Sequence, residues 1–169
     1  MKTAIYPGTF DPITYGHIDV LERAMELFDR VIITVARNSA KHPIFSDDER
    51  VEMIKEVVKK YGKRVAVDSF SGLLVEYAKT KGAIALVRGL RAVSDFEYEF
   101  QMALTNRKLA KKVMTVFLMP HEKYTYLNSS LVREIALHGG ALKDFVPPMV
   151  ERHLRRRVRD LQRRKYHIL

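Results

Sequence analysis

The sequence contains no cysteine, which excludes disulfide bonds, thiolate catalysis and cysteine-bound zinc. No apolar run approaches the roughly 20 residues that a membrane-spanning helix needs, and the N-terminal residues lack the apolar stretch of a signal peptide. The motifs GxGxxG and GxxxxGK[ST] are also absent, so neither dinucleotide binding of the dehydrogenase kind nor a P-loop is supported. We therefore expect a protein of the reducing cytoplasm that has no membrane partner.

The chain is rich in positive charge. Its 169 residues, 47% of them hydrophobic, suit one domain with its own core, and they carry a formal net charge of +10. Residues 151–169 hold eight basic and two acidic side chains, and therefore most of this surplus. Two interpretations compete at this point: a nucleic-acid-binding surface, or a solvated basic helix.

Strand-like and helix-like segments alternate along the chain. Apolar and β-branched runs predict strands at 2–6, 31–36, 65–69, 83–87 and 113–119. Helical spacing and capping residues predict helices at 17–28, 46–62, 73–81, 94–110, 128–138 and from 147 onward. This order predicts an α/β fold, namely a single Rossmann-like, doubly wound domain over residues 1–169. Its five-stranded parallel sheet would have helices on both faces, with a basic C-terminal helical extension at 147–169.

Three local patterns make this prediction checkable. Ser46 and Glu49 form a capping box at the start of a helix that Gly62 ends. The helix at 94–110 is expected to bury an inner stripe made of Phe96, Phe100, Ala103 and Leu104. The C-terminal helix is expected to pack an apolar stripe on the domain or on a neighbouring subunit, and that stripe consists of Val150, Leu154, Val158 and Leu161.

The loop after the first strand carries the strongest functional signal, because ligands of doubly wound sheets bind beyond the carboxyl ends of the strands. It runs from Tyr6 to His17 and contains two prolines and two glycines, which predicts a rigid turn. His17 stands at the start of a helix, where free amides and the helix dipole favour an anion. A lone histidine in such a position is more often structural, so the inference depends on the whole segment.

Residues 14–17 are Thr-Tyr-Gly-His, which resembles the [TH]-x-G-H signature of a nucleotidyltransferase superfamily. The sequence is similar to bacterial phosphopantetheine adenylyltransferases over 4–147. The similarity is most specific at 88–99, and 116–120 and 129–132 also match. The resemblance implies transfer of AMP from ATP to 4′-phosphopantetheine, which gives dephospho-coenzyme A (dephospho-CoA) and pyrophosphate. It also implies Mg²⁺ with the ATP, a homohexamer and feedback binding of coenzyme A (CoA).

The resemblance also implies site residues. His17 would stabilise the transition state of an in-line attack, a reaction that needs alignment and charge stabilisation more than a strong base. The implied ATP contacts are Thr9, Phe10, His17, Gly89, Leu90, Arg91, Glu99, Tyr124, Thr125, Tyr126, Leu127, Asn128, Ser129 and Ser130. The implied phosphopantetheine contacts are Thr9, Lys41, Leu74 and Arg88. Lys41 and Arg88 would neutralise the phosphate of that substrate. No protein ligand of the metal is assigned.

Ordinary structural roles remain open for several of these residues. Thr9 could stabilise the turn, and the side chains of Phe10 and Leu74 could belong to the core. Glu99 could be a surface carboxylate. Asn128 departs from the serine or threonine run of the family at the start of its helix, and it could be a plain helix cap.

Two other functions compete with this interpretation. A related nucleotidyltransferase with another acceptor, such as nicotinamide mononucleotide or glycerol phosphate, would share the same signature. An RNA-binding module that uses the basic C-terminal helix belongs to a different class, but the sequence shows no aromatic RNA-binding signature. We therefore expect no nucleic-acid partner.

Overall fold

A computed structural model describes residues 1–37, 43–91 and 93–166, with only the backbone described at 93–95 and 164–166. Five parallel strands form one sheet in the order β3-β2-β1-β4-β5. Their bounds are Thr3–Gly8 (β1), Arg30–Ala36 (β2), Val65–Phe70 (β3), Ala85–Gly89 (β4) and Met114–Leu118 (β5). The predicted α/β doubly wound fold is confirmed.

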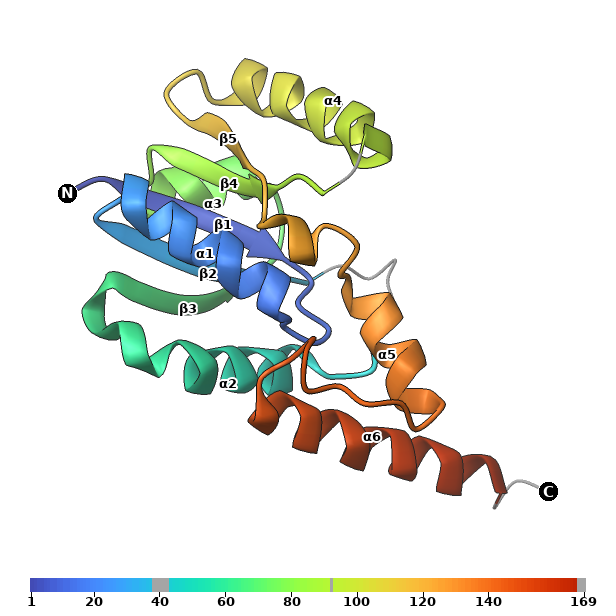
Figure 1. The fold of residues 1–169 in the computed structure, drawn as a ribbon. Coiled ribbons are helices and arrows are strands. Elements are labelled where there is room, and N and C mark those ends of the chain that lie inside the picture. The colour runs from blue at the N-terminus through green and yellow to red at the C-terminus, as the bar shows by residue number, and fades with distance from the viewer. Residues whose placement is uncertain (38–42, 92, 167–169) are drawn as a thin grey trace.

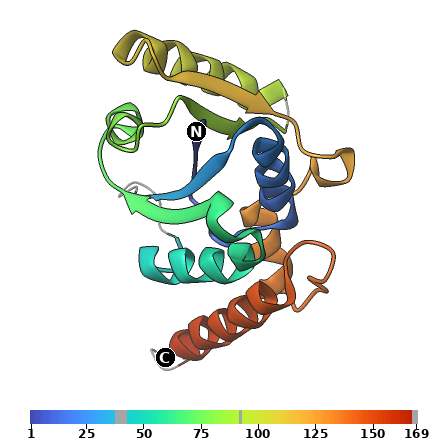
Figure 2. The ribbon, with the colours of Figure 1, turned by 90° about the vertical axis from the view of Figure 1, so that its left-hand side faces the viewer.

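Helices connect consecutive strands and cover both faces of this sheet (Figures 1 and 2). The α-helices are Tyr15–Leu27 (α1), Asp47–Val58 (α2), Leu74–Thr80 (α3), Val93–Leu109 (α4), Ser129–Leu137 (α5) and Pro148–Tyr166 (α6). Two 3-10 turns are Lys59–Arg64 (η1) and Glu122–Tyr124 (η2). Among the described residues, none of these helices is long and apolar enough to cross a membrane.

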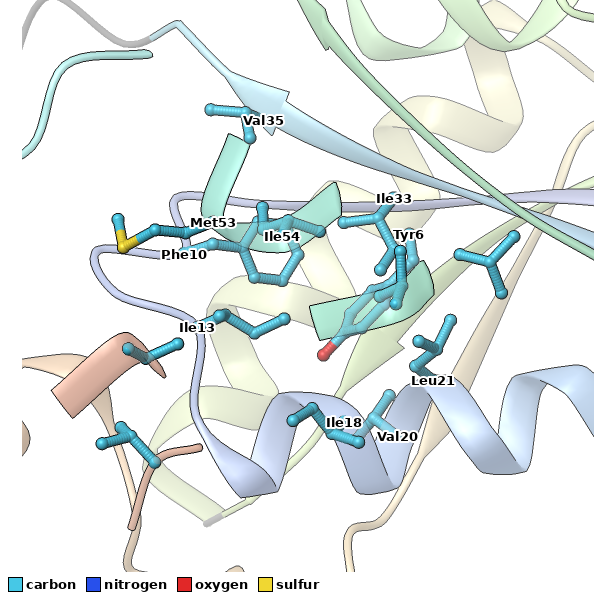
Figure 3. Packing of buried hydrophobic residues seen from close by; sticks show 14 of the residues in the cluster. Tyr6, Phe10, Ile13, Ile18, Val20, Leu21, Ile33, Val35, Met53 and Ile54 are labelled. Atoms are coloured by element: carbon cyan, nitrogen blue, oxygen red, sulfur yellow. The ribbon is translucent and has the colours of Figure 1, made fainter. Parts of the chain in front are cut away.

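Side chains alternate between the two faces of the sheet and build two separate apolar clusters. Along β1, Ile5 packs with α3, whereas Ala4 and Tyr6 belong to the larger cluster shared with α1 and α2. Figure 3 shows Tyr6 and Phe10 among residues of that larger cluster. The core therefore anchors the carboxyl end of β1 from the α1 side, where the loop to α1 begins.

The strand order changes direction at β1, which places β1 between β2 and β4. Consecutive strands run outward from β1 to β3, and the chain then returns to pair β4 with the other side of β1. The segments after β1 and β4 consequently diverge to opposite faces and leave a crevice between them. The loops after these two strands are those that carry most of the predicted site.

Local signals define α2 as predicted. The Ser46 hydroxyl accepts from the Glu49 amide at 3.2 Å, and the Glu49 carboxylate accepts from the Ser46 amide at 2.8 Å. The α-helical part ends earlier than Gly62, because the last turn tightens into η1. Gly62 then breaks the helical geometry with a φ of 60°, a conformation that glycine adopts at little cost.

The inner stripe predicted for the helix now labelled α4 is wrong. Phe96, Phe100 and Leu104 are 45%, 47% and 51% exposed. The helix packs beside the edge strand β5 (Figure 1), and these three side chains are not covered by the described part of the chain. Periodicity identified the helix, but it could not say whether the covering surface belongs to the same chain.

The stripe predicted for α6 is largely confirmed. Val150, Leu154 and Val158 are buried in the larger cluster, whereas Leu161 is 37% exposed near the free end of the helix. The helix packs beside α5 and α2 (Figure 1), and the basic side chains described on it, up to Arg163, are exposed or half-buried. The C-terminal charge is thus carried by a helix docked on the domain.

Candidate active site

A cleft of about 600 Å³ opens at the carboxyl ends of β1 and β4. Most of the predicted site residues line it, although they come from four separate segments of the chain. Those brought together are Thr9, Phe10, His17, Arg88, Gly89, Arg91, Glu99, Tyr124, Leu127, Asn128, Ser129 and Ser130. The cleft lies at the reversal of strand order, where a doubly wound sheet is expected to bind its ligand.

Of the other predicted residues that the structure describes, none lines this cleft. Leu90 and Thr125 lie next to lining residues in sequence, and Tyr126 is 60% exposed. Leu74 packs beside the α3 cluster, which is the core role that the sequence left open. Lys41 falls outside the described residues.

His17 is built into the cap of α1. Thr14 is the N-cap residue, and its hydroxyl accepts from the His17 amide at 3.4 Å. In return, the Thr14 amide donates to His17 Nδ1 at 3.1 Å. This is a capping box in which an imidazole takes the place of the usual glutamate, so the backbone fixes the orientation of the ring.

The hydrogen bond from the Thr14 amide also fixes the protonation of His17. Because Nδ1 accepts, the proton of the neutral ring sits on Nε2. Burial and the nearby guanidinium of Arg91 lower the pKa of His17 from 6.5 to about 4. At neutral pH the residue is therefore an uncharged N–H donor in the lining of the cleft.

Phe10 has a core side chain on an unusual backbone. Its ring is buried and packs edge-on against Tyr6 and His17, with centroids 5.4 and 5.1 Å away. Its φ of 48° is rare for a large residue and costs about 1–3 kcal/mol, an amount that burial of a phenyl ring, about 1.5–3 kcal/mol, can offset. Gly8 makes room for this ring, since an added Cβ would lie 2.8 Å from it.

Arg88 and Glu99 form a two-point ion pair inside the cleft. Arg88 Nε donates to Glu99 Oε2 at 2.8 Å, and Nη2 donates to Oε1. The third nitrogen, Nη1, donates to the Pro7 carbonyl at 3.3 Å. Burial acts to lower the pKa of Arg88, but its bonds to Glu99 and the charge of that carboxylate keep the pKa raised, so the guanidinium stays charged.

The start of α5 completes the opposite wall. Asn128 is the N-cap, and its side chain accepts from the Leu131 amide at 2.9 Å, so it serves as the helix cap that the sequence left open for it. The Ser129 hydroxyl donates to the Pro12 carbonyl at 2.8 Å. Arg91 Nη1 donates to the Leu127 carbonyl at 3.3 Å and so joins the β4 side of the cleft to this wall.

Comparison with known proteins identifies the family. A model described as cytidylyltransferase-like matches residues 5–135. The phosphopantetheine adenylyltransferase of Caldanaerobacter subterraneus subsp. tengcongensis is 58% identical over 154 residues, which are 91% of this chain and 96% of that protein. The chain belongs to the phosphopantetheine adenylyltransferase family. A second phosphopantetheine adenylyltransferase, from Desulforudis audaxviator, is 56% identical over 155 residues, which are 92% and 94% of the two chains.

More distant structures share the fold of this phosphopantetheine adenylyltransferase family member. A Plasmodium falciparum nicotinic acid mononucleotide adenylyltransferase in complex with NaAD has a TM-score of 0.65. The match covers 95% of this chain and 96% of that one at 15% sequence identity, so it supports the architecture alone.

Sequence reasoning missed the residues that hold the first loop of this adenylyltransferase family member. Arg50 Nη1 donates to the Thr9 carbonyl at 2.6 Å, and Arg133 Nη1 donates to the Asp11 carbonyl at 2.5 Å. The buried Asp11 carboxylate accepts from the amides of Ile44 and Phe45 at 2.9 and 3.1 Å. Arg50 had one available signal: it lies four positions before Ile54, which places a charge on the buried face of α2.

The carboxylates of the cleft are committed to partners within the phosphopantetheine adenylyltransferase fold. Asp11 pairs with Arg133 at 3.2 Å, and Glu99 pairs with Arg88. Among the described residues, no group of three or more histidine, aspartate or glutamate side chains is placed to hold a metal ion. The donor set of the cleft suits anions, so any cation there would be bound mainly by a phosphorylated ligand.

Proposed function

We propose that the protein transfers the adenylyl group of ATP to 4′-phosphopantetheine, giving dephospho-CoA and pyrophosphate. An oxygen of the acceptor phosphate attacks the α-phosphorus of ATP, and the bond from that phosphorus to the pyrophosphate group breaks. The acceptor phosphate is largely ionised near neutral pH, so no side chain has to remove a proton. The protein contributes alignment and charge stabilisation.

One observation carries this proposal: the neutral His17, whose Nδ1 is held by the Thr14 amide and whose Nε2 carries a proton in the lining of the cleft. A fixed N–H donor stabilises negative charge as it develops on the α-phosphate oxygens, and it needs no reorganisation at the moment of reaction. The family relationship supports the choice of ATP and phosphopantetheine as substrates.

The arginines of the cleft supply the rest of the charge. We assign Arg88, with Lys41 and Thr9, to the phosphate of phosphopantetheine, and Arg91 with the start of α5 to ATP. We propose that Mg²⁺ enters on the ATP phosphates, where it would neutralise part of their charge. Arg88, Arg91 and Arg133 give the cleft a positive surplus over Asp11 and Glu99, which favours capture of polyanions.

We further propose that the protein works as a homohexamer in the cytoplasm and that CoA binds the same cleft as a feedback inhibitor. The exposed apolar face of α4 supports the assembly, because it is a surface that a second copy of the chain would cover. CoA has the same pantetheine arm as the acceptor, so competition with phosphopantetheine is the expected form of its inhibition.

The test is an adenylyltransferase assay of pyrophosphate release with Mg-ATP and three acceptors: phosphopantetheine, nicotinamide mononucleotide and glycerol 3-phosphate. We expect turnover with phosphopantetheine alone, and ATP formation from dephospho-CoA and pyrophosphate in the reverse direction. Turnover with another acceptor instead would refute the assignment. Salt-dependent binding of generic RNA, tighter than binding of ATP, would favour the nucleic-acid alternative.

A further inference from the structure

The C-terminal helix α6 contacts, through Arg157, a segment that is itself hydrogen-bonded to the loop after β1. The guanidinium of Arg157 makes three contacts with the segment 44–49, which leads into α2. Its Nη1 donates to the Ile44 carbonyl at 2.9 Å, its Nη2 pairs with Glu49, and its Cζ lies 5.2 Å from the centroid of the Phe45 ring. A planar cation with several fixed donors suits this combination of carbonyl, carboxylate and aromatic partners.

The Ile44 residue links Arg157 to the loop after β1. Its carbonyl accepts from Arg157, and its amide donates to Asp11 Oδ2 at 2.9 Å. Asp11 is 2% exposed and immediately follows Thr9 and Phe10 in the lining of the cleft. One residue of the C-terminal helix is therefore two hydrogen bonds away from the loop that holds the substrates.

A second connection runs through Glu49. One carboxylate oxygen of Glu49 accepts from the Ser46 amide in the capping box of α2, and the other pairs with Arg157. The next residue, Arg50, donates to the Thr9 carbonyl at 2.6 Å. Both connections from Arg157 thus end on the same short loop, at Thr9 and at Asp11.

We propose that Arg157 is a positioning residue for the acceptor side of the active site. It holds the peptide of Ile44, which directly follows Pro43 of the cleft lining, and through Ile44 and Asp11 it sets the position of Thr9. In the sequence, the Ile44 peptide that Arg157 holds follows three residues after Lys41, which the proposed function assigns to the phosphate of phosphopantetheine, so we expect the effect to fall on phosphopantetheine more than on ATP. The inference rests on the function proposed above, and it assigns a role to one charge of the basic C-terminal helix.

The test compares Arg157→Ala and Arg157→Lys with Arg159→Ala, which removes an equal charge from an exposed position of the same helix. We expect Arg157→Ala to raise the KM for phosphopantetheine roughly five- to tenfold and to leave the KM for ATP within about twofold. Arg157→Lys should recover part of the loss, and Arg159→Ala should match the wild type. A lower Tm with both KM values unchanged, or an equal rise in both, would overturn the proposal.

A second variant tests the path and guards against poor folding of Arg157→Ala. Glu49→Gln leaves Arg157 in place but removes its carboxylate partner, so it should raise the same KM by a smaller factor. If Arg157 and Glu49 act through their mutual contact, the double variant should have the same KM for phosphopantetheine as Arg157→Ala alone. Additive increases in this KM would contradict the proposed path. The acceptor assay on the wild type comes first. Failure with phosphopantetheine there would refute the proposed function, and the Arg157 comparison would then be made with the acceptor that is used.

Discussion

The Nδ1 atom of His17 lies 3.1 Å from the backbone nitrogen of Thr14 and accepts its hydrogen bond, so the same imidazole caps α1 and points its N–H away from the helix. A cap and a proposed catalytic group are usually separate residues. Here His17 has both roles, so the backbone at the start of α1 sets the orientation of the proposed catalytic ring.

Replacement of His17 by alanine should lower kcat by about 10²–10³-fold, because it removes one donor to the developing charge. The Kd for ATP should change far less, since the other wall of the cleft remains. Steady-state kinetics and calorimetric titration with ATP measure the two effects. An enzyme with full kcat after this change would show that His17 has no role in the transition state.

The low pKa of His17 predicts a specific pH dependence of stability. The pKa of His17 is about 4 in the folded state against an ordinary 6.5 for histidine, so the unfolded chain binds more protons at this position between these pH values. The contribution of the neutral His17 to the free energy of unfolding is complete above pH 6.5, and it is lost as the pH falls toward 4. As the pH is lowered from 6.5 to 4, the Tm of the wild type should therefore fall relative to the Tm of His17→Gln, whose glutamine does not titrate. An NMR titration of the His17 ring should give a midpoint near 4, and a midpoint near 6.5 would contradict the prediction.

Asp11→Asn should destabilise the protein by about 2–4 kcal/mol, because Arg133 loses its buried partner and two backbone amides lose a charged acceptor. Urea unfolding gives the free energy. Asp144→Asn, an exposed carboxylate after α5, is the matched control and should be neutral. Equal stability of the two variants would mean that the Asp11 contacts contribute little.

The pair of Arg88 and Glu99 predicts that Glu99 acts in part through Arg88. Glu99→Gln should raise the KM for phosphopantetheine about tenfold, because the guanidinium loses the partner that orients it. Glu97→Gln, an exposed change on the same helix, serves as the control. An effect of Glu99→Gln confined to the KM for ATP would instead favour the direct ATP contact that the family resemblance implies.

The exposed face of α4 predicts the state of assembly. Phe96 and Phe100 stack with centroids 5.6 Å apart on this face. Phe100→Glu should dissociate the proposed hexamer into smaller species in sedimentation velocity, whereas Leu27→Glu, an exposed apolar position on α1, should leave it intact. A wild-type protein that sediments as a monomer would refute the assembly.

The sequence predicted most of the fold because local patterns and packing agree in it. The strands are β-branched runs, the capping box of Ser46 and Glu49 marks the start of α2, and the first three residues of the α6 stripe are buried. The exposure of Phe96 and Phe100 could not be predicted, because periodicity indicates which side of a helix is apolar but not whether another part of the chain covers it.

The residues of the candidate site that belong to a local motif could be predicted from the sequence. Those that are held by long-range contacts could not. The motif at residues 14–17 identified His17. It did not indicate that the backbone amide of Thr14 would orient the imidazole ring through the capping hydrogen bond. Arg133 and Asp11 are 122 positions apart in the chain, and their contact exists only after the fold has formed. Such pairs have no signature at short range, so a single sequence does not reveal them.

The contacts that hold the loop after β1, made by Arg50 and Arg133 and indirectly by Arg157, have a consequence for folding during synthesis. Thr9 and Asp11 come before the side chains that fix them, which belong to α2 and α5, and Arg157 of α6 is 113 positions after Ile44. The first strand can be paired and buried long before this loop is held. We therefore expect a nascent chain to pair its first strands early and to hold this loop only after α2, α5 and α6 have been made.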